Sequence, residues 1–218
     1  MIKNAMNIDN RSSQFWNWFN SNKAKYEYTL ANLNSLHQSE IDEAMNVFEE
    51  KLHVYNENIW FRMGGEKPYD LLITAEGNIE EFDAVIALVN SAHTIENWKI
   101  IPFIQARDIS KFNYRLDDFV LTEKDVFFTY MENPCGGNGS YLETMFYVSD
   151  KKFINDDAFK SSIIRIAETA LGEYDFAKII GCIDVEKVSN IYSEHKSEIL
   201  PIYKLKDISE SIKNKLRE

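Results

Sequence analysis

The strongest pattern near the start of the chain is the aromatic segment FWNWF at residues 15–19. At ~100° per residue its four aromatic side chains fall within one arc of a helix, while Asn17 points the other way. We therefore predict a helix with a wide apolar stripe and with Ser12 or Ser13 as its N-cap. Such a stripe either packs in a core or forms a surface for a ligand or partner, and we interpret this one as core packing.

Residues 39–104 alternate between helical and strand spacing. Ser39 with Asp42 resembles a capping box and opens a second helix. The pattern then predicts two strands joined by a turn, another helix and a third strand. The expected elements cover residues 39–55, 59–63, 71–75, 78–92 and 98–104.

The second half of the chain repeats this order of strand, strand, helix and strand. Gly64-Gly65 precedes Tyr69 by the same interval that separates Gly136-Gly137 from Tyr141. Turns favour glycine and strands favour aromatic residues in any case, so the match leaves a true duplication open. The pseudo-repeat covers residues 57–107 and 126–189, and the strands and helix of its second copy are expected at 126–132, 142–148, 157–171 and 179–188.

These elements predict the α+β class, with a largely antiparallel or mixed sheet and helices packed against it. The halves read as two strand-strand-helix-strand units. Because no Pro/Gly/Ser-rich linker separates them, we predict a single α+β domain over residues 1–218.

Composition narrows the class of function. The chain has 218 residues with 44% hydrophobic and 13% aromatic content, which is typical of a globular protein. Its net charge of −11 argues against nucleic acid and against anionic membranes as partners. No apolar run suits a signal peptide or a membrane span, and frequent Asn, Lys and Ile are typical of an AT-rich bacterial genome. We expect a bacterial, cytoplasmic protein.

The two cysteines, Cys135 and Cys182, give neither a disulfide framework nor a zinc signature. The four histidines are scattered rather than paired at ligand spacing. We therefore predict no metal site and no cofactor.

The Gly-rich loop 133–140 is the leading candidate for a ligand-binding site, because such a turn can direct backbone N–H groups at a ligand. It lacks the Lys and the following helix of a phosphate loop, and it precedes a strand, so a hairpin turn is the alternative. Cys135 within it would become a nucleophile only if a group from elsewhere in the fold lowered its pKa.

Carboxylates form the other candidate sites. Asp117 and Asp118 open a group at 117–125 that suits acid–base chemistry or a hard cation, with turn capping as the alternative. Glu173 follows Gly172, which is placed to end a helix as its C-cap, and an extended conformation is considered for residues 173–175. The candidates for ligand binding are thus Cys135, Asp117, Asp118 and Glu173, with no catalytic residue identified.

The segments FWNWF at 15–19, LLITAEG at 71–77, NWK at 97–99 and ALGEYDFAKIIG at 170–181 make most of the chain resemble a family of uncharacterised bacterial proteins, a domain-of-unknown-function family. The resemblance implies a compact intracellular domain. It implies no reaction, cofactor or catalytic residue.

Two functions are compatible with the sequence. The first is a non-enzymatic protein-interaction, immunity or accessory factor that binds a basic protein partner through an acidic surface. The alternative is an enzyme or small-ligand-binding protein with a site near loop 133–140 or the carboxylates 117–125. Neither the substrate nor the oligomeric state follows from the sequence.

Overall fold

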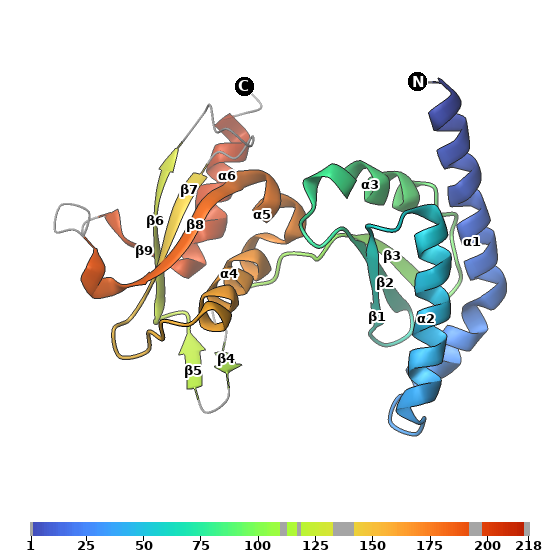
Figure 1. Ribbon diagram of the computed structural model, residues 1–218, viewed down its shortest axis with the longest axis horizontal. Coiled ribbons are helices and arrows are strands. Elements are labelled where there is room, and N and C mark those ends of the chain that lie inside the picture. Colours follow the sequence, from blue (N-terminus) through green and yellow to red (C-terminus); the bar gives the residue numbers. More distant parts are fainter. Residues whose placement is uncertain (1, 110–112, 117–118, 133–141, 192–197, 216–218) are drawn as a thin grey trace. The chain divides into compact units, whose positions relative to one another are not determined.

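The computed structural model describes residues 2–109, 113–116, 119–132, 142–191 and 198–215 (Figure 1). Helices and mixed parallel and antiparallel sheets confirm the α+β class. The chain divides into two compact units, Met1–Ile104 and Gln105–Glu218. A single domain over residues 1–218 would require these two units to fold and unfold together. The prediction of a single domain therefore stays a prediction.

Unit 1 holds three strands, three α-helices and one short 3-10 turn. In chain order they are α1 (Ile2–Ala31), α2 (Gln38–Tyr55), β1 (Trp60–Gly64), β2 (Tyr69–Thr74), η1 (Ile79–Glu81), α3 (Phe82–Asn90) and β3 (Trp98–Pro102).

The sheet of unit 1 has the order β1-β2-β3. β1 pairs antiparallel with β2 through a short hairpin, whereas β3 returns parallel to β2 after the crossover through α3. Alternate residues of β2, including Leu71 and Ile73, are fully buried, while Asp70 is exposed. This alternation indicates a sheet with one packed face and one wetter face.

The aromatic segment of α1 packs against this sheet and against α2, which confirms the core interpretation. Phe19 is completely buried, and its ring centroid lies 5.0 Å from that of Trp98 on β3. Phe48 of α2 is also buried, 5.6 Å from Phe19 and 4.3 Å from Phe61 of β1. The pairs of Phe19 with Trp98 and with Phe48 are edge-to-face, an arrangement that adds to the stabilisation from burial.

Helix α1 also caps the C-terminal ends of the two other helices. The indole N–H of Trp16 donates to the carbonyl of Leu88 in the last turn of α3, at 2.8 Å. A guanidinium N–H of Arg11 donates to the carbonyl of Tyr55, the last residue of α2, at 3.1 Å. Carbonyls in a last helical turn lack the usual partner within the helix, so these donors add hydrogen bonds at the ends of α2 and α3. The Leu88 carbonyl also accepts from the hydroxyl of Ser91 at 2.7 Å.

The predicted starts of the first two helices were wrong. α1 begins at Ile2, so Ser12 and Ser13 lie inside the helix. α2 begins at Gln38, and the reciprocal contact at its start is a hydrogen bond from the His37 N–H to the Glu40 carboxylate at 3.0 Å. Serine and threonine inside a helix can bond a carbonyl four residues earlier, so they do not always mark its beginning.

Unit 2 holds two small sheets and three α-helices within the part of the chain that is described. Its elements are β4 (Asn113–Leu116), β5 (Phe119–Thr122), β6 (Val126–Glu132), β7 (Leu142–Val148), α4 (Asp157–Leu171), α5 (Glu173–Ile179), β8 (Ile180–Lys187), η2 (Val188–Asn190), β9 (Leu200–Pro201), η4 (Ile202–Lys204) and α6 (Leu205–Lys215).

The larger sheet of unit 2 has the order β8-β7-β6-β9. β6 and β7 form an antiparallel pair, and β8 lies parallel to β7 after the crossover through α4 and α5 (Figure 1). Its inward face forms one hydrophobic core with α4 and α6, in which Phe128, Phe146 and Ile163 are fully buried. The sheet therefore forms one layer, and the helices α4 and α6 form a second layer packed against it.

The predicted strand-strand-helix-strand order is confirmed in both halves. In each half the first two strands are antiparallel and the third lies parallel to the second. A shared topology is compatible with duplication but also arises independently, so the pseudo-repeat over 57–107 and 126–189 stays a prediction as an evolutionary statement.

No helix in the described ranges is long and apolar enough to cross a membrane.

Candidate functional site

Three of the candidate residues from the sequence lie outside the described residues. They are Cys135, Asp117 and Asp118. The whole Gly-rich segment 133–140 also lies outside the described residues. Their proposed contact with a ligand stays a prediction.

Glu173 lies in the first turn of α5 and is fully buried. The residue before it, Gly172, has φ 78° and ends α4, with its N–H donating to the carbonyl of Glu168 at 2.7 Å. The positive φ explains glycine at this position. The extended conformation considered for residues 173–175 is wrong, because these residues form a helix in which Asp175 pairs with Lys213 at 2.6 Å.

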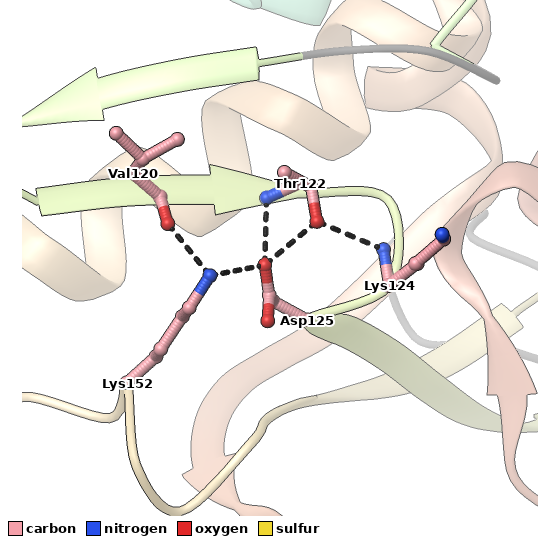
Figure 2. Close-up of polar contacts among 5 residues, drawn as sticks. All are labelled: Val120, Thr122, Lys124, Asp125 and Lys152. Carbon is pink, nitrogen blue, oxygen red and sulfur yellow. Dashed lines mark hydrogen bonds and ion pairs between the residues drawn. The ribbon is translucent and has the colours of Figure 1, made fainter.

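Asp125 is the described carboxylate of the 117–125 group with the clearest network, and it holds the turn between β5 and β6 (Figure 2). Its Oδ2 accepts from the backbone N–H and the hydroxyl of Thr122, at 2.9 and 2.8 Å. The same oxygen accepts from the ammonium group of Lys152 at 2.7 Å, and that ammonium also donates to the carbonyl of Val120 at 2.9 Å. This arrangement is turn capping, the alternative already considered for these carboxylates.

The electrostatics of Asp125 support the same interpretation. Burial alone raises the pKa of this carboxyl, but hydrogen bonds from Lys152 and Thr122 outweigh it and hold the pKa below its ordinary value of 3.8. A general acid or base at neutral pH needs a pKa shifted the other way. Asp125 therefore acts as a fixed negative charge that fastens residues 120–125 to Lys152.

The outer face of the β6–β7 pair is a further candidate surface. Burial alternates strictly along β7, so Thr144 and Phe146 face the core while Glu143, Met145 and Tyr147 lie on the other side and are half-buried. The pairing register places three residues of β6 directly opposite them. We call this set the outer face, and it comprises Phe127, Thr129, Met131, Glu143, Met145 and Tyr147.

A hollow of about 330 Å³ lies on the outer face. Met131, which is 66% exposed, lines it together with Met145 and Tyr147. The charged residues among its described lining are two carboxylates, Glu143 and Glu198, without a Lys or Arg. Next to Tyr147 on β8 lies Glu186, so the acidic character continues across the sheet. Methionine side chains are flexible and polarisable, which suits them to contact with a protein partner.

No three His, Cys, Asp or Glu side chains of the described residues are arranged to hold a metal ion.

Comparison with known proteins finds no matching family model, no matching curated protein and no matching solved structure. Membership of the bacterial family that the motifs resemble therefore stays a prediction.

The hydrophobic pattern predicts the strands of the outer face but does not mark their exposed sides as a site. The signal was present in the segment LETMFYV at 142–148, where alternate positions carry Glu143, Met145 and Tyr147. A period of two places these three residues on one face. Met131 and Met145 of neighbouring strands share this face because of the pairing register, which cannot be read directly from the sequence.

Proposed function

We propose that this chain is a non-enzymatic interaction protein of the bacterial cytoplasm, an immunity or accessory factor that binds a basic protein partner. The observation that carries the proposal is the outer face, where Met131, Met145 and Tyr147 form an apolar floor beside Glu143 and Glu198. An apolar centre with charge at its edge is the usual composition of a protein interface. The net charge of −11 would speed the approach of a cationic partner.

The rival proposal of an enzyme has weaker support in the described residues. Asp125 is bound to Lys152 and Thr122 and caps a turn, and Glu173 is fully buried. A broad, half-exposed sheet face suits a protein partner better than it suits a small substrate, which usually binds in an enclosed concave site.

The genomic neighbourhood tests this proposal first, because an immunity factor requires a toxin-like gene beside its own; co-expression with the product of such a gene is the second step. We expect the wild-type chain to relieve the toxicity and Met131→Arg to lose that ability, because the substitution places a cation where a cationic partner must dock. The matched control is Tyr28→Arg, which introduces the same charge at a residue of α1 that is 62% exposed. Equal protection by all three proteins would exclude the outer face, and no protection by the wild type would exclude the immunity function.

A further inference from the structure

A second hollow, of about 170 Å³, lies in unit 1 along the groove between α1 and α2. It is remote in sequence from the outer face and independent of the proposed function. Gln14 contributes to its rim. Its remaining described lining consists of Arg11, Phe15, Trp18, Lys51, Val54 and Tyr55.

The lining of this hollow is largely apolar and aromatic. Phe15 and Tyr55 are buried members of the unit 1 core, and Trp18 is half-buried beside them. Val54, also in the lining, is 67% exposed. An apolar body seated in the groove would remove this side chain from water.

The charged groups in this lining are both cationic. Arg11 and Lys51 contribute to it, and its described part includes no Asp or Glu. This contrasts with the acidic balance of the whole chain, whose net charge is −11.

Much of the hydrogen-bonding capacity of these groups is unused within the described residues. The Arg11 guanidinium has five N–H donors, and one of them donates to the Tyr55 carbonyl at 3.1 Å. The same guanidinium lies 5.9 Å from the centre of the Tyr55 ring, which fixes its position beside the hollow. For Lys51 and for the indole N–H of Trp18, the described residues supply no hydrogen-bond acceptor.

We propose that this groove binds a small carboxylate with an aromatic or branched aliphatic body. The planar guanidinium of Arg11 matches a carboxylate in geometry, and Lys51 adds a second positive charge. The apolar body lies over Trp18 and Val54. A monoanion fits better than a doubly charged phosphate, because the net negative charge of the chain opposes each further negative charge. The volume of about 170 Å³ limits the ligand to a single ring or a short branched chain.

Titration of the full chain with phenylacetate, followed through the indole N–H signal of Trp18 in a ¹H–¹⁵N spectrum, tests the proposal. A Trp18→Phe variant assigns that signal among the four tryptophans. We expect a saturable shift with a dissociation constant below about 1 mM, and little shift with the uncharged phenylacetamide at equal concentration. Lys51→Gln should weaken phenylacetate binding about 5-fold, since it removes one partly solvated ion pair.

Lys99→Gln provides the matched control, because it makes the same change at an exposed residue of β3 outside this lining. Its affinity for phenylacetate should equal that of the wild type. Both substituted residues are exposed, so unfolding midpoints should confirm intact folds. The proposal is overturned by the absence of saturation up to about 10 mM phenylacetate, by an equal response to phenylacetamide, or by unchanged affinity in Lys51→Gln.

Discussion

Individual buried side chains in unit 1 contribute very unequally to stability. The ring of Tyr26 is completely buried among aromatic residues, yet its hydroxyl has no hydrogen-bond partner within the described residues. Burial raises the pKa of this hydroxyl to about 12. The hydroxyl has lost its hydration without replacement, whereas the ring packs 5.5 Å from Phe48.

Tyr26→Phe should therefore leave the free energy of unfolding unchanged or raise it by about 1 kcal/mol, because it removes an unsatisfied polar group and keeps the ring. Denaturant unfolding at neutral pH measures the change. A loss of more than about 1 kcal/mol would show that the hydroxyl has a partner in the folded protein.

Phe19→Ala should have a much larger effect, a loss of roughly 3–5 kcal/mol, because Phe19 is completely buried and its removal leaves a cavity between α1 and β3. The control is Val54→Ala at a residue that is 67% exposed, for which we expect a change within about 0.5 kcal/mol. A lower midpoint with an unchanged denaturant slope would indicate lost packing. Equal effects of the two substitutions would contradict the core assignment.

At the scale of elements, the turn between β5 and β6 depends on the charge of Asp125. Asp125→Asn keeps the size of the side chain but removes the ion pair with Lys152, which measures 2.7 Å in a site where the carboxyl is only 14% exposed. We expect a loss of about 1–3 kcal/mol at pH 7. Glu123→Gln, an isosteric change of the same charge two residues earlier, should have a smaller effect.

The effect of Asp125→Asn should depend on pH in a defined direction. The folded-state pKa of Asp125 is held below its ordinary value of 3.8, so the folded state binds this proton less readily than the unfolded state. Its contribution to stability is complete above the unfolded pKa and is lost as the pH falls through the folded pKa. The difference between wild type and Asp125→Asn should therefore shrink below about pH 4, and a difference that grows on acidification would contradict this assignment.

Element types were readily predicted, and so were the bounds of β6, β7 and α4, but not every helix start. The spacing of apolar residues and the turn-forming residues identify the hairpin at 60–74 and the crossover helix at 157–171. In both segments the local conformational preference of the residues agrees with the hydrophobic pattern. The start of α1 could not be predicted in this way. Hydroxyl side chains inside it, such as Ser21 and Thr29, donate to carbonyls four residues earlier at 2.9 and 3.0 Å, and so imitate helix-end signals.

The candidate sites were less predictable than the fold. The sequence made Glu173 a candidate for ligand binding, but in the structure this residue, at the turn from α4 into α5, is completely buried. The outer face and the groove beside Arg11 each combine residues from different elements. Their composition depends on strand register and helix packing, which one sequence specifies only through the whole fold.

At the scale of the whole molecule, the predicted single domain can be tested with the intrinsic fluorophores. All four tryptophans lie in unit 1, so tryptophan fluorescence follows that unit, whereas circular dichroism follows both. Phe128→Ala removes a fully buried ring from the core of unit 2. If the chain unfolds as one domain, the substitution should lower the tryptophan midpoint together with the circular dichroism midpoint.

Met131→Ala is the control for that experiment, because Met131 is 66% exposed on the side of β6 opposite to Phe128. Its two midpoints should stay close to those of the wild type. A tryptophan midpoint that does not respond to Phe128→Ala would show that the two units unfold independently.

Where a toxin-like gene for a basic protein lies beside the gene of this chain, the most direct test of the proposed function is the dissociation constant between the two purified proteins. It is measured by calorimetry for wild type, Met131→Arg and Tyr28→Arg. We predict tight binding by the wild type and Tyr28→Arg, with affinity that falls as salt rises, and a loss of at least about 10-fold for Met131→Arg. Undiminished affinity in Met131→Arg, or no binding by the wild type, would contradict the assignment of the outer face as the binding surface for a basic partner.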